Sequence, residues 1–376
     1  MNIQYRKKIE NLESHFSPYA TKSTKSHGRK FPLVESAYRT PFERDCHRIL
    51  HSLPFRRLKH KTQVFFSPKD DHICTRMEHS LHVASIATTV CIRLDLNPTL
   101  AEAIALAHDL GHPPFGHSGE KALENICLEH ELSGFKHEAQ SLRVIDCFKN
   151  RLHGLLSLTY EVRDGVVCHW GEKHEQKLEP DDSKDITRVD FTAARTQRPA
   201  TIEGCVVRMC DTISYLGRDY EDATMAKLVK RNCLPYNIKK NLGTNNSRII
   251  GTLVDDLVKT SRGKNFLMYS EKIFQSMEEM RDFNDKNIYQ KQELSGQRNR
   301  IQLIFNQIFD HFLKELEQGT GKHKDYYCLT FAEFIRDMKY TVETPDAQKV
   351  VDFIAGMTDN FALGCFEDLF SIERVI

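Results

Sequence analysis

The chain has 376 residues, which is enough for one large domain or two ordinary ones with a substantial buried core. Its 53 Lys and Arg residues almost balance its 52 Asp and Glu residues, and the formal net charge of +1 provides no global field for binding nucleic acid or an anionic membrane. The 11 cysteines form no C-x-x-C pair, so we interpret them as reduced, and the lack of a signal peptide or membrane span predicts a cytoplasmic protein.

The amino-terminal part of the sequence precedes the first strong helical pattern. Residues 1–30 are polar and basic, and we expect a flexible arm there without chemistry of its own. Residues 52–66 mix basic and aromatic side chains. The first helix is predicted over residues 77–94, because apolar residues recur at three- and four-residue steps along two stripes. A helix that is apolar on two sides is expected to be buried.

The next two predicted helices lie on either side of a turn that contains glycine and proline. One covers residues 100–110 and ends at Gly111, with two prolines just beyond it. The other begins after Ser118, because a serine followed by an acidic first turn is typical of a helix amino terminus. Further helices are expected near residues 138–149, 200–217, 271–291, 298–317 and 346–358.

Little of the remaining sequence indicates strands. Residues 165–191 are too charged and irregular for a core, and they are predicted to form a surface excursion. Strand-like alternation is scarce throughout, so the predicted fold class is all-α. We expect a catalytic core over residues 31–225 and a helical carboxy-terminal region over residues 226–376.

One short segment concentrates the residues that could carry chemistry. AIALAHDLGHPPFGHSGEKAL places His108, Asp109, His112, His117 and Glu120 within thirteen positions. Imidazole nitrogen and carboxylate oxygen together suit Mn²⁺, Fe²⁺, Co²⁺, Zn²⁺ or Mg²⁺, whereas an all-thiolate zinc site would need paired cysteines. Adjacent residues of a helix point about 100° apart, so His108 and Asp109 can share an ion only where the helix ends or where the ion lies between two helices.

Two further metal-ligand candidates lie outside this segment. His79 falls within the predicted buried helix, where an imidazole needs a partner, and the simpler alternative is a hydrogen-bonded core histidine. Asp211 falls near the apolar face of the helix predicted over residues 200–217. Asp211, Tyr215 and Asp219 follow one another at four-residue steps, so they line one stripe of that helix. An ordinary, partly exposed helix edge is the alternative for this stripe.

Four ordered sequence blocks resemble the HD-domain deoxynucleotide triphosphohydrolases, the dGTPase-like family. The blocks are RMEHSLHV at 76–83, AHDLGHPPFGHSGE at 107–120, HEAQSLR at 137–143 and VVRMCDTISYLGRD at 206–219. RTPFERD at 39–45 and FRRLKHKTQVF at 55–65 resemble the same family. The resemblance spans roughly residues 39–225 and is weak beyond them, which would make the catalytic core an HD-type helical fold with a helical carboxy-terminal extension.

The resemblance implies a metal-dependent reaction. One divalent ion per site, which could be Mn, Fe, Co, Mg or Zn, would be held by His79, His108, Asp109 and Asp211. In this family a water polarised by the ion attacks the α-phosphorus of a deoxynucleoside triphosphate, releasing the deoxynucleoside and tripolyphosphate. A preference for dGTP is one possibility that the resemblance raises.

The resemblance also implies a set of catalytic residues. His112 and His117 match active-site histidines of the family, and Glu120, three residues after His117, would orient that imidazole and stabilise its charge. His137 and Glu138 match a second active-site pair. For Glu120 the alternative is an acidic residue that stabilises a helix amino terminus, and both roles can hold together.

The implied contacts to substrate phosphates are basic. Arg76, three residues before His79, resembles an arginine that binds a phosphate next to the metal, and a surface salt bridge is its alternative. Arg57 belongs to a run of basic residues that could bind phosphates, although a solvated face or an oligomer contact is the commoner fate of such runs.

The implied contacts to the sugar come from two parts of the sequence. Gln63 resembles a residue that hydrogen-bonds the 3′ hydroxyl, while its neighbour Val64 would exclude a 2′ hydroxyl by packing. Tyr215 resembles a ring that stacks on the sugar, and Asp219 resembles a carboxylate near the 3′ hydroxyl.

Two other functions remain open from the sequence. The chain could be another HD phosphohydrolase that acts on nucleoside monophosphates or signalling nucleotides. It could also be a regulator that binds nucleotides or single-stranded nucleic acid through the basic residues 55–61. Relatives are commonly homo-oligomers activated by nucleotides, so a nucleotide effector and self-association are expected partners, and no membrane partner is expected.

Overall fold

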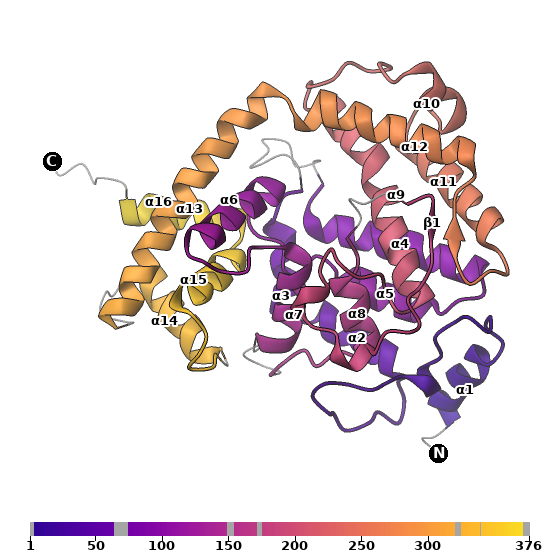
Figure 1. Cartoon of the computed structure of the whole chain (residues 1–376), viewed down its shortest axis with the longest axis horizontal. Coiled ribbons are helices and arrows are strands. Elements are labelled where there is room, and N and C mark those ends of the chain that lie inside the picture. The colour runs from indigo at the N-terminus through magenta and orange to yellow at the C-terminus, as the bar shows by residue number, and fades with distance from the viewer. Residues whose placement is uncertain are drawn as a thin grey trace. The chain divides into compact units, whose positions relative to one another are not determined.

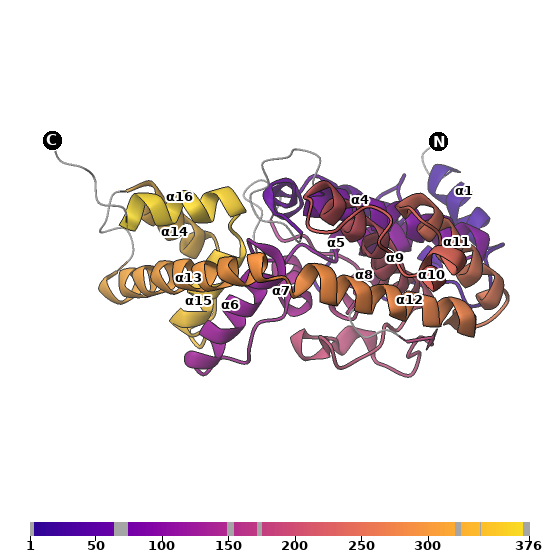
Figure 2. The same cartoon turned by 90° about the horizontal axis from the view of Figure 1, so that it is seen from above.

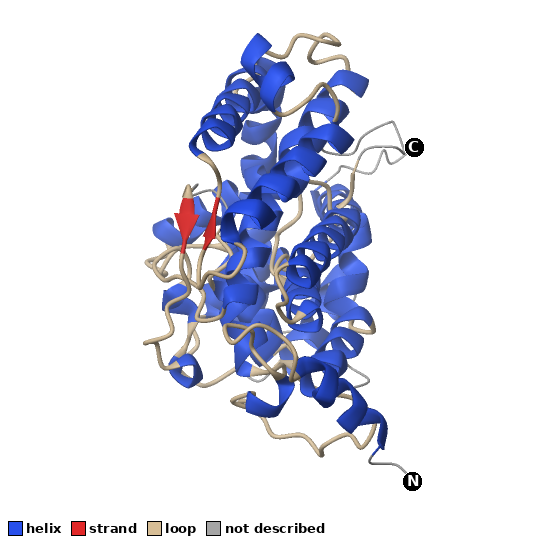
Figure 3. Ribbon diagram, turned by 90° about the vertical axis from the view of Figure 1, so that its right-hand side faces the viewer, coloured by secondary structure: helices blue, strands red, loops and turns tan. Residues whose placement is uncertain are grey.

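The computed structural model describes residues 4–63, 74–148, 154–170, 175–319, 325–338 and 340–370. These residues form sixteen α-helices and one sheet of two short strands, which confirms the predicted all-α class. The sheet pairs β1 (Lys177–Leu178) with β2 (Leu267–Met268) in antiparallel orientation, and Figure 3 shows it as two short arrows among the helices. None of the helices in this described part is both long enough and apolar enough to cross a membrane.

The chain divides into two compact units, each assembled from three separate stretches. The first unit contains Met1–His51, Glu78–Asp109 and Ser157–Lys291, and the second contains Ser52–Met77, Leu110–Leu156 and Gln292–Ile376. The predicted boundaries between the arm, the catalytic core and the carboxy-terminal region stay predictions.

The first unit is built around one apolar helix. Its helices, labelled in Figure 1, are α1 (Gln4–Glu13), α2 (Pro41–Leu50), most of α4 (Arg76–Arg93), α5 (Pro98–Ala107), α8 (Tyr160–Val167), α9 (Ile202–Met225), α10 (Tyr236–Asn241), α11 (Asn246–Ser261) and α12 (Glu271–Asn284), which a π-helical turn (Asp285–Tyr289) follows. The alanine-rich α5 packs against α2, α8 and α9, and its residues from Ala103 to Ala107 are all buried. Asn97 caps α5, because its side-chain oxygen accepts hydrogen bonds from two backbone N–H groups of the first turn.

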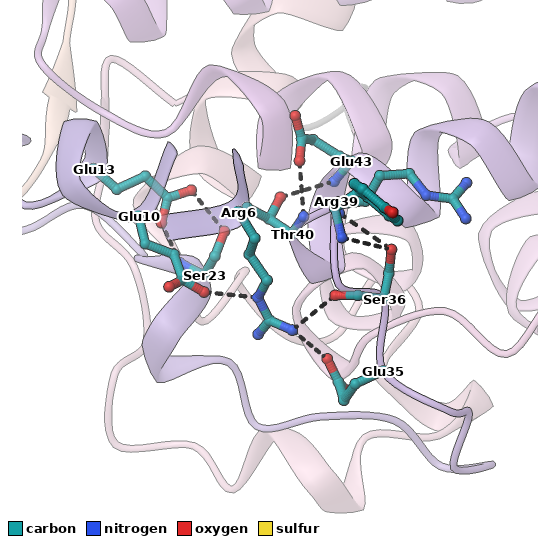
Figure 4. Close-up of polar contacts among 10 residues, drawn as sticks. Arg6, Glu10, Glu13, Ser23, Glu35, Ser36, Arg39, Thr40 and Glu43 are labelled. Atoms are coloured by element: carbon teal, nitrogen blue, oxygen red, sulfur yellow. Dashed lines mark hydrogen bonds and ion pairs between the residues drawn. The ribbon is translucent and has the colours of Figure 1, made fainter. Parts of the chain in front are cut away.

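The amino-terminal segment is attached to this unit by buried carboxylates. Glu13, at the end of α1, accepts hydrogen bonds from the backbone and hydroxyl of Ser23 and from the Asn97 side chain. Figure 4 shows the Glu13–Ser23 contact and the ion pairs of Arg6 with neighbouring carboxylates. Thr21 donates its backbone N–H to Glu203 on α9. This ordered arrangement differs from the flexible arm predicted for residues 1–30, because composition does not reveal partners that lie far along the chain.

The second unit is organised around the long helix α13 (Gln292–Gln318). Its other helices are α3 (Leu53–Arg57), α6 (Gly116–Glu129), α7 (His137–Cys147), α14 (Tyr326–Asp337), α15 (Asp346–Ala355) and α16 (Asp359–Phe370). α13 contacts α6, α14, α15 and α16, which lie around it in Figure 2. The core between them is aromatic: the ring of Phe312 lies 4.6 Å from that of Phe331 and 5.0 Å from that of Phe353, centroid to centroid.

The helices that carry the motifs lie close to their predicted positions. The helix predicted over 77–94 is α4, which begins and ends one residue earlier. α5 ends at Ala107, three residues before the predicted end, because residues 108–111 form a turn. The helix predicted to begin after Ser118 is α6, which begins at Gly116 and therefore includes His117.

Candidate functional site

Three elements of the first unit bring the four predicted metal ligands together. His79 lies on α4, His108 and Asp109 directly follow α5, and Asp211 lies on α9. The Nε2 atom of His79 is 2.9 Å from Oδ1 of Asp211, and Nε2 of His108 is 3.9 Å from the same oxygen and 3.6 Å from Oδ1 of Asp109. All four residues are largely buried. Nitrogen and oxygen donors that converge in this way could hold one divalent cation.

The end of α5 explains how two consecutive residues contribute to this cluster. Because α5 ends at Ala107, His108 is the first residue beyond the helix and Asp109 already belongs to the turn. Nδ1 of His108 lies 2.6 Å from the carbonyl oxygen of Ala105. A carbonyl can only accept, so Nδ1 carries the ring proton and Nε2 of the neutral ring carries the lone pair. The condition that sequence reasoning set for His108 and Asp109, a helix that ends at this point, is therefore met.

His79 is oriented through a hydroxyl group on α9. Its Nδ1 lies 3.2 Å from Oγ of Ser214, and this hydroxyl donates its own hydrogen to the carbonyl oxygen of Asp211 at 2.8 Å. The hydroxyl therefore accepts the Nδ1 proton of His79, which directs Nε2 of that ring toward the Asp211 carboxylate. Histidines that bind metals usually have their second nitrogen fixed in this way.

The charge state of Asp211 also suits a cation. Burial alone would raise its pKa, but the hydrogen bond from His79 and the positive charges of His79, His108 and His169, when these rings are protonated, lower the pKa to about 2. Asp211 is therefore an ionised carboxylate at neutral pH. An anionic oxygen beside imidazole lone pairs fits a divalent ion such as Mn²⁺, Fe²⁺, Co²⁺ or Zn²⁺.

Two groups in the first unit were missed by sequence reasoning. Tyr289, in the π-helical turn after α12, donates its hydroxyl hydrogen to the carboxylate of Asp219, the residue predicted to contact the sugar. Burial, and then the charge of Asp219, raises the pKa of Tyr289. Tyr215 lies one turn before Asp219 on α9 and is partly buried. No sequence signal marks the π-helical turn, which is a feature that proteins often use at functional sites.

The second missed group is His169, and its burial corrects the interpretation of residues 165–191 as a surface excursion. Gly165, Val166 and Val167 are the last residues of α8 and are fully buried, and only 1% of the His169 surface is exposed. Residues 165–169, with the apolar sequence GVVCH, belong to the buried part of the chain. The many charged residues that follow them dominate the average composition of residues 165–191, so this short run was not recognised.

The second unit contains a separate group of histidines and glutamates. The ring of His112 stacks on that of His137 with centroids 4.4 Å apart, and its centroid lies 5.6 Å from that of His117. Glu120 lies between two of these rings, with one carboxylate oxygen 3.1 Å from Nδ1 of His137 and the other 3.4 Å from Nδ1 of His117. Glu138 is fully buried, and one of its oxygens is 3.6 Å from Nδ1 of His137. We refer to these five residues as the histidine cluster.

Glu120 is the electrostatic centre of the histidine cluster. Burial alone would raise its pKa, but the charge of His137 and hydrogen bonds from His117 and His137 hold that pKa well below its usual range. The side chain of His117 is 58% exposed, whereas the other members of the cluster are buried. His117 is therefore the member that an incoming molecule can reach directly, and the Glu120 carboxylate behind it stabilises any positive charge on the ring.

The turn between α5 and α6 is fixed by contacts within the second unit. Lys61 is buried and donates from Nζ to the carbonyl oxygens of His112, at 2.5 Å, and Ala355, at 2.8 Å. Gly116 has a φ of 55°, and a Cβ atom there would lie 2.3 Å from the carbonyl oxygen of Gln63. Only glycine permits this backbone conformation together with so close an approach. The turn thus places Gln63 against the start of α6.

The predicted substrate contacts of the second unit are in different surroundings. Gln63 and Arg76 are buried, and the backbone N–H of Arg76 donates to the Lys61 carbonyl at 3.0 Å. Arg57 is exposed and donates to the Gly356 carbonyl at 3.1 Å beside an apolar cavity of about 340 Å³ lined by aromatic residues of α14 and α15. Val64 lies outside the described residues. The roles assigned to these side chains stay predictions.

Comparison with known proteins adds information that geometry alone does not contain. The HD domain family matches residues 76–216, and a phosphohydrolase-associated domain matches residues 267–368. The chain is 37% identical over 369 residues to a deoxyguanosinetriphosphate triphosphohydrolase-like protein of Desulfatibacillum aliphaticivorans, with 97% of each chain covered. Proteins with the same description from Caldanaerobacter subterraneus and Clostridium tetani are 36% and 35% identical, and the matches cover at least 96% of every chain.

The HD match contains all four residues of the first-unit cluster and the entire histidine cluster, so family membership and geometry concern the same side chains. The relatives are matched along nearly their whole length. The chain belongs to the HD-domain, deoxyguanosinetriphosphate triphosphohydrolase-like family of hydrolases.

Proposed function

We propose that this protein hydrolyses deoxynucleoside triphosphates to deoxynucleosides and tripolyphosphate. The observation that carries the proposal is the convergence of His79, His108, Asp109 and Asp211, whose donor atoms suit a divalent ion. Such an ion, when bound, would polarise a water molecule for attack on phosphorus and reduce the negative charge of the phosphate oxygens. The family relationship supports a nucleotide triphosphate as the substrate class.

The first-unit cluster has the properties that this role requires. Asp211 is ionised, and Ser214 and the Ala105 carbonyl fix Nδ1 of His79 and His108, so Nε2 is the nitrogen of each ring that would bind a cation. Tyr215 and Asp219 continue the same helix toward its carboxyl end and are proposed to contact the deoxyribose. Tyr289 fixes the Asp219 carboxylate, which would hold that oxygen in a constant position for a sugar hydroxyl.

The histidine cluster is proposed to handle protons. Attack of water on the α-phosphorus forms a new P–O bond and breaks the bond to the 5′ oxygen, which must then receive a proton to leave as the deoxynucleoside. His117 is exposed and backed by the ionised Glu120, so it suits this donor role. His112, His137 and Glu138 would maintain the protonation and orientation of the cluster.

The substrate and the products can be tested together. Purified protein is incubated with each dNTP and Mn²⁺ in water enriched in ¹⁸O, and the products are separated by chromatography and weighed by mass spectrometry. We expect unlabelled deoxynucleoside and tripolyphosphate that contains the heavy oxygen. The reason is that the attacked α-phosphorus stays bonded to the β- and γ-phosphates in the tripolyphosphate product. Heavy oxygen in a nucleoside monophosphate, or the formation of pyrophosphate, would contradict the proposal.

Two histidine variants, one at the proposed metal site and one as its control, extend this experiment. His108→Ala removes a proposed metal ligand and should abolish turnover, whereas His15→Ala removes an exposed histidine next to α1 and should preserve it. Turnover of nucleoside monophosphates with no turnover of any dNTP would favour another HD phosphohydrolase instead. Base preference, a nucleotide effector, self-association and a cytoplasmic location stay predictions that the same panel of nucleotides, sizing and cell fractionation can address.

A further inference from the structure

His169 occupies a place beside the proposed metal ligands that none of the sequence motifs predicts. It follows the carboxyl end of α8 and is 1% exposed. The centroid of its ring is 5.0 Å from that of His108, and the two planes are inclined by 80°. A ring nitrogen of His169 and a carboxylate oxygen of Asp109 lie within 4.8 Å of each other. A buried imidazole therefore lies beside two of the residues that would hold the ion.

The protonation of this ring can be assigned from its partner. Nδ1 of His169 lies 2.5 Å from the carbonyl oxygen of Val166, which can only accept a hydrogen bond. Nδ1 therefore carries the proton, and Nε2 of the neutral ring carries a lone pair. His108 makes the equivalent contact with the carbonyl of Ala105, also three residues earlier. In both rings, Nδ1 is thus fixed by a backbone carbonyl and Nε2 points away from it, which is the arrangement typical of metal-binding histidines.

Close packing of two helices brings the two rings together. α5 ends just before His108 and α8 ends just before Cys168 and His169, and the two helices are in contact. A Cβ atom on Gly165 would lie 2.6 Å from Cδ1 of Ile104, so a larger residue at this position would push α8 away from α5. The absence of a side chain at Gly165 therefore sets the separation between His169 and His108.

The end of α8 is also fixed from its other side. Lys184 donates from Nζ to Asp164 at 2.5 Å and to the sulfur of Cys168 at 3.5 Å. The second carboxylate oxygen of Asp164 accepts the backbone N–H of Ala200 at 2.6 Å. These contacts hold the residue next to His169, so the fold itself determines the position of its ring.

We propose that His169 is a fifth protein group of the metal centre, contributing its Nε2 lone pair beside the ligands His79, His108, Asp109 and Asp211. The proposal rests on the proposed function only in that both require an ion at these residues. A third imidazole makes the donor set richer in nitrogen, which favours Mn²⁺, Co²⁺ or Zn²⁺ over Mg²⁺, an ion that prefers oxygen ligands. The structure thus points to His169 as a determinant of metal affinity and metal choice.

The test uses substitutions that separate metal binding from folding. His169→Asn keeps an N–H that can donate to the Val166 carbonyl but removes Nε2, whereas His169→Ala removes both. Cys91→Ala is the control, because it changes a buried cysteine near the carboxyl end of α4 without altering the proposed ligands or the contacts at the end of α8. For each full-length protein, Mn²⁺ and Mg²⁺ affinities are measured by calorimetry, Co²⁺ binding by visible absorption, and folding by thermal denaturation without metal.

We expect His169→Asn to weaken Mn²⁺ binding by about 10- to 100-fold, to reduce the preference for Mn²⁺ over Mg²⁺, and to change the Co²⁺ spectrum. Added imidazole should restore part of the Mn²⁺ affinity of His169→Ala, while Cys91→Ala should match the wild-type affinity. Wild-type Mn²⁺ affinity in a folded His169→Asn protein would overturn the proposal and leave the proposed function intact. A wild-type protein that binds no divalent ion would overturn both.

Discussion

The first-unit cluster and the histidine cluster both contain buried imidazoles, but the two regions fix those imidazoles with different kinds of oxygen. In the first unit, Nδ1 of His79 contacts a hydroxyl and Nδ1 of His108 contacts a backbone carbonyl, and both oxygens are neutral. In the second unit, Nδ1 of His117 and Nδ1 of His137 contact the ionised carboxylate of Glu120.

This difference teaches how the same side chain acquires two functions. A neutral oxygen at Nδ1 fixes the tautomer of an imidazole, so Nε2 is the nitrogen that would bind a cation, beside the Asp211 carboxylate. An ionised carboxylate stabilises the positive charge that the ring carries after it accepts a proton. The first region is therefore suited to holding a metal ion, and the second is suited to proton transfer.

The largest expected effect is the loss of a ligand in the first region. His108→Ala should remove both the bound metal and turnover, lowering kcat by about 10⁴-fold, because metal catalysis contributes several kcal/mol and each 1.36 kcal/mol corresponds to a tenfold change in rate. Metal content is measured by elemental analysis and turnover by product release. A His108→Ala protein that keeps its metal would contradict the assignment of metal binding to the first region.

A smaller effect is expected for the exposed member of the histidine cluster. His117→Ala should lower kcat by about 10³-fold, within the range that general acid catalysis contributes, while the metal content stays at the wild-type level. His130→Ala is the matched control, because this histidine lies at the other end of α6 with its ring against Phe309. Loss of metal from His117→Ala, or normal turnover by it, would contradict the division of roles between the two regions.

Replacing the anchoring carboxylate should have a still smaller effect on turnover. Glu120→Gln keeps the shape of the side chain but removes its charge, so kcat should fall by about 10²-fold, the lower end of the range for proton-transfer groups. The pH profile of kcat should change with it, because the charge behind His117 is lost. An unchanged pH profile with reduced kcat would indicate that Glu120 only positions the ring.

The smallest expected effect is on the free energy of unfolding. It concerns Glu203, a buried glutamate whose surroundings differ from those of Glu120. Glu203 accepts the backbone N–H groups of Thr21 and Asn97, and burial, outweighing these hydrogen bonds, raises its pKa from 4.5 to about 7. The folded state therefore holds an extra proton between about pH 4.5 and pH 7, so this group destabilises the fold as pH rises through that window. The loss should be roughly 1–3 kcal/mol, since one pKa unit corresponds to about 1.4 kcal/mol.

Glu203→Gln should remove this part of the pH dependence. Urea denaturation of the wild-type and variant proteins at pH 5 and pH 8 gives the difference directly, and turnover should be unaffected. An equal loss of stability in both proteins between these pH values would show that Glu203 does not titrate in the window. Such a result would remove the contrast with Glu120, whose pKa is shifted in the opposite direction by its imidazole neighbours.

Most of the fold class and the motif-bearing helices could be predicted from the sequence. The apolar stripes of α4 and the alanine-rich run of α5 are local patterns, and they position His79 and His108 to within one helical turn. The predicted end of α5 was three residues too late, because the sequence does not show that the backbone turns at His108 rather than after Leu110. The burial of α8 was missed because its eight residues precede a charged stretch that dominates the local composition.

The pairing of residues across the chain could not be predicted in the same way. Spacing indicated that Glu120 contacts His117, but not that it also contacts His137, seventeen residues away. Tyr289 and Asp219 are seventy residues apart, and their contact depends on an irregular turn after α12. Such contacts depend on how separate helices pack, and local periodicity contains no information about that packing.

The sequence by itself determined the helical class, the family resemblance and the residues His79, His108, Asp109 and Asp211 as candidate metal ligands. These conclusions rest on residue type and short-range spacing, which a helix converts directly into common faces. Only the tertiary structure decided which oxygen fixes each imidazole, and that His169 lies beside His108, because those contacts require α4, α5, α8 and α9 to pack together.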